Sequence, residues 1–324
     1  MKKHLMFAVA VLLAGLGAGA CAQEFPARPV SLLVPYPAGA ASDITARAVQ
    51  GPISHSLGVQ VVVENLGGAN GALGANRVLN AKADGYTLFQ GSPNELILAG
   101  LTNKAVAYKP DDFLFVAPVA TSPYVVITRA GLGAANVDEL LALARQRGVP
   151  LTYGSGGAGS MIHLISEALA QRTGVKLTHI PYRGGAPLIT DLAGGQIDFA
   201  IVPYQANYDD MRREGRLKII GTLNRERLPA LPDVPSVQES ATLKDFNYTI
   251  WTAYLVKKGT PADAVQKLHQ AVQASLRDAA ARKTLEAQGK ILFPPQSLAE
   301  GQAFYAEQTA SLAELVRRSG FRGE

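Results

Sequence analysis

The feature that most constrains the fold is the stretch 152–164, which has the pattern of a strand end, a glycine-rich turn and a helix start. The turn holds four glycines, which permit positive φ and let a ligand approach the main chain closely. Ser160 can cap a helix expected over residues 161–171, whose first turn leaves N–H groups free at the positive end of the helix dipole. The stretch therefore predicts a cradle for a small anion. The alternative is a glycine-rich turn that holds no ligand.

Nucleotide-binding motifs fit this stretch only in part. Gly154, Gly156 and Gly159 match the dinucleotide fingerprint in spacing, but the next expected strand, 175–180, ends without the acid that would hold a ribose. Ser160 stands where a phosphate-binding loop needs lysine. We therefore expect no nucleotide cofactor, and an anion smaller than a nucleotide.

The same order of strand, small-residue loop and helix start recurs along the chain. Loops rich in glycine, alanine or serine follow expected strands at 30–34, 59–64, 86–90 and 177–180. Strands that alternate with helices predict an α/β fold with mainly parallel sheets, which bind ligands at the carboxyl ends of their strands. Further strands are expected at 115–119, 124–128, 197–202, 218–223 and 249–256. Further helices are expected at 44–57, 72–81, 137–147, 187–193, 261–280, 282–288 and 298–318, the first capped by Ser42 or Asp43.

The N-terminus has the pattern of a secretory signal: Lys2 and Lys3, an apolar run and small residues. Cleavage before Gln23 predicts a periplasmic protein, and lipid attachment at Cys21 is the less favoured alternative. Cys21 is the only cysteine and the five histidines are scattered, so no metal site is expected. Loss of Lys2 and Lys3 lowers the formal charge from +5 to +3. Without a long basic run, nucleic-acid binding is not expected.

A set of short motifs, in this order and spacing, resembles a known family. The motifs are Val34-Pro35-Tyr36-Pro37-Ala38-Gly39 with Asp43 and Arg47, Val63-Glu64-Asn65 with the glycines to Gly74, Ala83-Asp84-Gly85-Tyr86-Thr87-Leu88, Tyr153-Gly154-Ser155 to Ser160 with His163-Leu164, Pro181-Tyr182-Arg183-Gly184-Gly185-Ala186-Pro187 with Asp191, Gly194 and Gly195, and Arg225 with Leu228-Pro229 and Pro232-Asp233-Val234-Pro235. The chain resembles the substrate-binding receptors of tripartite tricarboxylate transporters, the Bug-type periplasmic receptors. It departs from them at Ala40, where a second glycine is usual, and at Leu66-Gly67, where Arg-Pro is usual.

The resemblance implies a periplasmic binding protein-like fold, with two α/β domains that face each other across a ligand cleft. The expected division is a signal peptide at 1–22, a first domain at 23–124 plus 250–324, and a second domain at 125–249. The resemblance also implies that main-chain N–H groups and ordered waters hold a small carboxylate. The protein would be a monomer that delivers this ligand to the membrane subunits of a transporter.

Candidate ligand-binding residues lie on the loops that follow the strands. They are Tyr36, Pro37, Ala38, Gly39, Ser42, Asn70, Ser92, Asn94, Ser155, Gly159, Ser160, His163, Arg183, Gly184, Gly185, Ala186, Asp191 and Tyr204. Arg183 can pair with a carboxylate or stay solvated, and His163 can contact a ligand or pack. Asp191 would anchor a loop or accept a ligand amine, whereas Tyr204 forms a wall or part of the core.

Three functions remain open from the sequence. The first is a binding protein, not an enzyme, that captures a dicarboxylate, an amino acid, or an aromatic or nicotinate-like acid. The second is an exported hydrolase, for which Ser155, Ser160, His163, His179 and Asp191 supply the residue types without a recognised order. The third is a receptor that presents its ligand to a membrane sensor.

Overall fold

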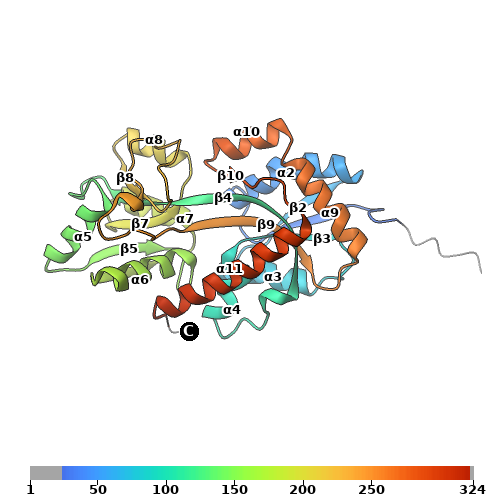
Figure 1. The fold of residues 1–324 in the computed structure, drawn as a ribbon, viewed down its shortest axis with the longest axis horizontal. Coiled ribbons are helices and arrows are strands. Elements are labelled where there is room, and N and C mark those ends of the chain that lie inside the picture. Colours follow the sequence, from blue (N-terminus) through green and yellow to red (C-terminus); the bar gives the residue numbers. More distant parts are fainter. Residues whose placement is uncertain (1–23, 322–324) are drawn as a thin grey trace, which may run out of the picture.

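The computed structural model describes residues 24–321, in which two groups of strands are joined by two long strands, β4 (Phe113–Arg129) and β9 (Thr249–Lys257) (Figure 1). The predicted signal peptide and Cys21 lie outside the described residues. The other strands are β1 (Val30–Val34), β2 (Val61–Asn65), β3 (Thr87–Gly91), β5 (Leu151–Ser155), β6 (Leu177–Pro181), β7 (Phe199–Pro203), β8 (Leu217–Thr222) and β10 (Ile291–Leu292).

The strands follow the order β2-β1-β3-β9-β4-β7-β5-β6, and β8 and β10 also pair with β4. The α/β fold is confirmed, and both sheets are mixed rather than mainly parallel. Pairs within β1–β3 and within β5–β7 are parallel, as alternating strands and helices predict. Every pair that includes β4 or β9 is antiparallel.

β4 is one strand, so the predicted break between 119 and 124 is wrong. Its first part pairs with β9 as far as Pro123, and Tyr124 begins the pairing with β7. The ladder between β4 and β9 accommodates Pro118 by register shifts on both sides. We call residues 24–123 and 249–321 the first lobe, and residues 124–248 the second. The domain boundaries given above stay a prediction.

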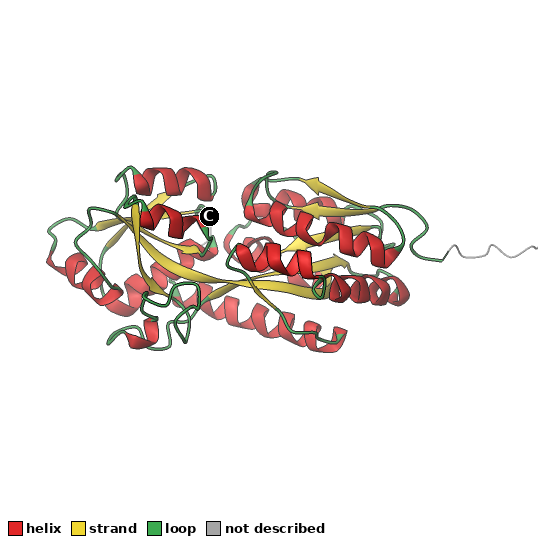
Figure 2. Ribbon diagram, turned by 90° about the horizontal axis from the view of Figure 1, so that it is seen from above, coloured by secondary structure: helices red, strands yellow, loops and turns green. Residues whose placement is uncertain are grey.

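We call the place where β4 passes from the first lobe to the second, near Pro123 and Tyr124, the crossing of the lobes. The carboxyl ends of the parallel strands in both lobes point toward this crossing. In the first lobe, Gly91 at the end of β3 lies opposite Ala253. In the second lobe, Pro203 at the end of β7 lies opposite Tyr124. Seen from above, the long strands run continuously between the lobes (Figure 2). The loops that follow the strands are therefore placed at the junction of the lobes.

The helices match most predicted positions. They are α2 (Ala41–Leu57), α3 (Ala72–Leu79), α4 (Ala99–Thr102), α5 (Val137–Gln146), α6 (Met161–Thr173), α7 (Gly185–Ala193), α8 (Asn207–Arg213), α9 (Ala262–Ser275), α10 (Ala279–Ala287) and α11 (Leu298–Arg318), and a π-helical turn (Asn94–Leu98) precedes α4. Helix α2 begins three residues earlier than predicted, and Ala40 at its N-cap offers no side-chain cap, so neither Ser42 nor Asp43 is the N-cap. Helix α7 begins at Gly185 rather than Pro187.

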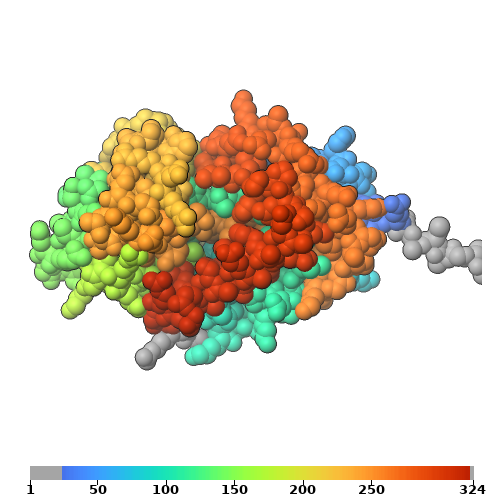
Figure 3. All heavy atoms as spheres, viewed as in Figure 1, coloured from blue at the N-terminus to red at the C-terminus, as the bar shows by residue number. Residues whose placement is uncertain are grey.

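The hydrophobic core joins the lobes on one face only. One buried cluster includes α3 and α11 of the first lobe together with α5 and α6 of the second. On the other face, the cluster beneath α2, α9 and α10 is separate from the cluster beneath α7 and α8. The surface is hollowed between the α8 and α10 regions, and atoms in the blue-green of β4 show at the bottom (Figure 3). The lobes therefore share one core on the α6/α11 face and have separate cores on the opposite face.

Candidate ligand-binding site

The start of α2 presents free main-chain donors. The loop between β1 and α2 exposes Pro37, Ala38 and Gly39. Gly39 has φ +79°, and its N–H donates to Asp43 Oδ2 at 2.9 Å. Burial alone would raise the pKa of Asp43, but hydrogen bonds from Arg47 and from Gly39 lower it. The N–H groups of the first three helical residues, 41–43, have no hydrogen-bond partner among the described residues.

Side chains from neighbouring strands hold this loop. Gln90 Nε2 donates to the Ser42 carbonyl oxygen at 2.7 Å, and Asn65 Nδ2 donates to the Tyr36 carbonyl oxygen at 3.0 Å. Because both supports end on main-chain oxygens, they orient the helix start without using its N–H groups. The donors are thus fixed before a ligand arrives, which lowers the entropy cost of binding.

The start of α7 presents a second set of free main-chain N–H donors, in the other lobe. Gly184, at φ +111°, precedes the helix, and the N–H groups of Gly185 and Ala186 have no partner among the described residues. Arg183 beside them is exposed. Asp191 accepts a hydrogen bond from the Tyr182 hydroxyl at 2.8 Å, so its carboxylate anchors this loop.

The start of α6, the predicted cradle, is largely satisfied by the protein itself. Ser160 is the N-cap, as predicted: its Oγ accepts from the His163 N–H at 3.3 Å. The Met161 N–H donates to Asn94 Oδ1 of the first lobe at 3.0 Å, and the Gly159 N–H donates to His163 Nδ1 at 3.0 Å. Few of the N–H groups at the start of α6 are therefore left to bind a ligand.

The turn before α6 also packs against the first lobe. A Cβ at Gly159 would lie 2.5 Å from the Cβ of Thr102, at the end of α4. Together with the Asn94–Met161 hydrogen bond, this contact joins the lobes on the α6/α11 face. Asn94 and Gly159, both predicted as ligand contacts, are placed here as contacts between the lobes.

A serine and two histidines lie behind the α6 turn. Ser155 is fully buried; its Oγ lies 2.6 Å from His179 Nε2 and accepts from the Gly157 N–H at 3.1 Å. His163 and His179 are stacked with ring centroids 4.0 Å apart. Burial and the neighbouring His163 lower the pKa of His179 to about 4, so its ring is neutral at pH 7. The serine orders the glycine-rich turn.

This serine–histidine pair lacks the third member of a hydrolytic triad. Among residues 24–321, no carboxylate oxygen lies within 4.0 Å of a His179 ring nitrogen. Without an orienting acid, and with the serine shielded from solvent, the geometry does not favour nucleophilic attack.

A buried glutamate, Glu95, holds Tyr36 and Ser92 of the first lobe. Its role was not predicted from the sequence. Glu95 accepts from the Tyr36 hydroxyl at 2.9 Å, from Ser92 Oγ at 2.9 Å and from the Ser92 N–H. Burial raises the pKa of Glu95 to about 7, although these hydrogen bonds act to lower it. Only a glycine fits at position 71, because a Cβ there would lie 2.7 Å from the Glu95 Cβ. Tyr36 and Ser92, both predicted as ligand contacts, are thus brought together through Glu95.

Two predicted residues occupy other surroundings. Asn70 has φ +52° in the turn before α3 and makes no side-chain hydrogen bond among the described residues. Tyr204 is 5% exposed and packs with α7 and α8 in the second-lobe core, so its side chain is part of the core.

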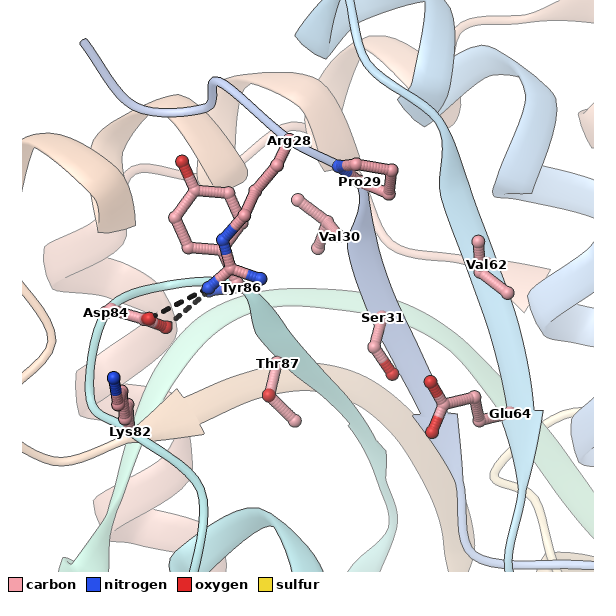
Figure 4. Close-up of a pocket in the computed structure, with 10 residues that line it drawn as sticks. All are labelled: Arg28, Pro29, Val30, Ser31, Val62, Glu64, Lys82, Asp84, Tyr86 and Thr87. Carbon is pink, nitrogen blue, oxygen red and sulfur yellow. Dashed lines mark hydrogen bonds and ion pairs between the residues drawn. The ribbon is translucent and has the colours of Figure 1, made fainter. Parts of the chain in front are cut away.

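A pocket of about 370 Å³ lies at the opposite, amino-terminal ends of β1 and β3 (Figure 4). Arg28 lies over the ring of Tyr86 and forms an ion pair with Asp84 at 3.0 Å. Glu64 and Asp84 both line this pocket. Two carboxylates and two basic side chains, Arg28 and Lys82, line the pocket, and Arg28 is already paired, so the lining has no excess of positive charge to favour an anion.

The fold and these loops match known proteins. Residues 45–320 match the family model described as the tripartite tricarboxylate transporter family receptor. The chain belongs to this family. BugT of Bordetella pertussis is 31% identical over 315 residues, which cover 96% of this chain and 95% of BugT.

Solved structures of the receptor family agree with the match. The periplasmic binding protein BugD has a TM-score of 0.82 at 30% identity, covering 93% of this chain and 100% of its own. MatC from Rhodopseudomonas palustris with bound malate has a TM-score of 0.81 at 28% identity, covering 90% and 100%. The R. palustris protein Rpa4515 with adipate has a TM-score of 0.84 at 28% identity, covering 93% and 100%. This receptor therefore has the fold of two-domain periplasmic solute-binding proteins.

Proposed function

We propose that this receptor captures a small carboxylate between its lobes and delivers it to the membrane subunits of a tripartite tricarboxylate-type transporter. The observation that carries the proposal is the pair of free helix starts, at α2 in the first lobe and α7 in the second. Each follows a strand whose carboxyl end points toward the crossing of the lobes. Free N–H groups at the positive end of a helix favour an anion.

The ligand is held mainly by main-chain donors and becomes enclosed as the lobes close. Arg183 is the basic side chain beside these donors, and it is exposed. A carboxylate that bridges the two helix starts would draw the lobes together, because it binds both only when they are close. The domain boundaries given above describe the two bodies that would move.

The family relationship supports the rest of the proposal. Relatives include a periplasmic binding protein, and two neighbours hold malate and adipate. We propose from this that the receptor is periplasmic, and that dicarboxylates of four to six carbons are the first ligands to test; a monomer is our proposal as well. No helix within residues 24–321 is long and apolar enough to cross a membrane.

A thermal-shift screen of the mature protein tests the proposal. The panel contains malate, adipate, amino acids and aromatic acids, and the uncharged amide of each acid is its control. A ligand at a hundred times its dissociation constant stabilises the folded state by about 2.7 kcal/mol, which raises the melting temperature visibly. We expect at least one acid, and not its amide, to do so. A panel without any stabilising acid would contradict the proposed function.

A further inference from the structure

Lys290 is a half-buried cation beside the crossing of the lobes. It lies in the turn between α10 and β10, and β10 pairs with β4 so that Ile291 is opposite Thr121. The Lys290 Nζ is 3.4 Å from the Oγ of Ser122, one residue before Pro123, where the pairing of β4 changes lobes. The lysine therefore lies at the junction rather than on an outer surface.

The backbone beside Lys290 contacts the second lobe. A Cβ at Gly289 would lie 2.4 Å from the Cδ1 of Tyr204, so the Tyr204 ring rests directly on this turn. The Tyr204 N–H in turn donates to the Pro123 carbonyl oxygen at 2.7 Å. The turn that carries Lys290 is thus fixed between β4 of the first lobe and the end of β7 in the second.

The ammonium group has no acidic partner within the described part of the chain. No carboxylate oxygen lies within 4.0 Å of Nζ, and Asp209 on the nearby α8 is already paired with Arg212 and Arg213. Burial lowers the pKa of Lys290 to about 8, with no opposing charge to raise it. The group is still largely protonated at pH 7, and a charge that is partly removed from water without an acidic partner is disfavoured.

This position lies on the face where the lobes have separate cores. The clusters under α10 and under α8 are separate, and the surface between them is hollowed with β4 at the bottom (Figure 3). A small acid that enters between the lobes could reach the strand on which the Lys290 ammonium rests. An anion from solution would supply the missing counter-charge.

We propose that Lys290 binds a second acidic group of the ligand, so that this receptor prefers dicarboxylates to monocarboxylates. The inference rests on the proposed function: the first carboxylate is held by the helix starts of α2 and α7, and the second pairs with Lys290 and Ser122. Lys290 is then a specificity-determining residue. Its partial burial without a counter-charge disfavours the free protein, and the diacid supplies that counter-charge when it binds.

Matched pairs of acids test this role by calorimetric titration. The pairs are adipate with hexanoate, and malate with 3-hydroxybutyrate. The proteins are the wild type, Lys290→Met, and Lys283→Met, which removes an exposed lysine of α10. Loss of a charge-assisted hydrogen bond predicts about a tenfold or greater loss of diacid affinity in Lys290→Met, with little change for the monoacid. Lys283→Met should bind like the wild type.

Two further results complete the test. Free Lys290→Met should melt no lower than the wild type, because an apolar side chain replaces an unpaired cation. Unchanged diacid affinity in Lys290→Met, or an equal loss for diacid and monoacid, would overturn the inference and leave the proposed function intact. A wild-type protein that binds no acid of the panel would overturn the proposed function itself.

Discussion

The hydrogen bond between Asn94 and Met161 allows a direct test of how the lobes are held together. Asn94 Oδ1 belongs to the first lobe and accepts from the first N–H of α6 in the second at 3.0 Å, so the bond exists only when the lobes are together. Asn94→Ala removes the acceptor. A neutral hydrogen bond contributes about 0.5–1.5 kcal/mol, equivalent to about a 2- to 13-fold change in the ratio of closed to open molecules.

A ligand that binds only closed molecules should lose affinity by up to this same factor. Solution scattering should show a larger radius of gyration for the free variant, and titration with the acid that stabilises the wild type most should show weaker binding. Asn76→Ala is the control, since this exposed asparagine of the first lobe makes no side-chain hydrogen bond among the described residues. Tighter binding by Asn94→Ala would refute the reasoning, because it would mean that the ligand competes with Asn94 for the Met161 N–H.

Other substitutions test single features of the site. Gly159→Ala should weaken ligand binding, because its Cβ would meet Thr102 of the other lobe. Gly174 has the same φ of +70° but open space around it, so Gly174→Ala should cost only about 1–2 kcal/mol of stability from backbone strain. Equal ligand affinities of the two variants in titration would contradict this. Glu95, whose pKa is raised to about 7, stabilises the fold below pH 4.5 and loses this contribution as the pH rises to 7. The free energy of unfolding of the wild type should therefore fall by on the order of 3 kcal/mol over this pH range relative to that of Glu95→Gln. Parallel pH profiles of this free energy in the two proteins would exclude the effect. Arg183→Ala should weaken carboxylate binding by less than about tenfold, since the side chain is exposed, and its complete loss would indicate side-chain rather than main-chain recognition.

Local signals in the sequence predicted the start of α6 at the correct residue, and those of α2 and α7 within three residues. Ser160 caps α6 and Gly174 ends it in the left-handed conformation, both as the residue types predict. The small-residue loops that follow β1 and β6 likewise lead into α2 and α7. These features depend on a few neighbouring residues, so a single sequence is enough to place them.

Contacts between distant segments could not be predicted in this way. Glu95 directly precedes the apolar residues 96–98, and only the fold brings Tyr36 onto its carboxylate. The sequence suggests that Lys290 is a surface lysine after a glycine, and the pairing of β10 with β4 makes it half-buried beside Ser122. The α6 cradle was predicted from its own residues, whereas its first donor is taken by Asn94, 67 positions earlier.

The most direct test of the proposed function follows the backbone amides of the ¹⁵N-labelled mature receptor by NMR. The titrant is the acid that gives the largest thermal shift. If the carboxylate bridges the starts of α2 and α7, the amide signals of Ala41, Ser42, Gly185 and Ala186 should shift most, while that of Met161 changes little. Large shifts at Met161, or at the pocket beside Arg28, with both helix starts unchanged, would contradict the account.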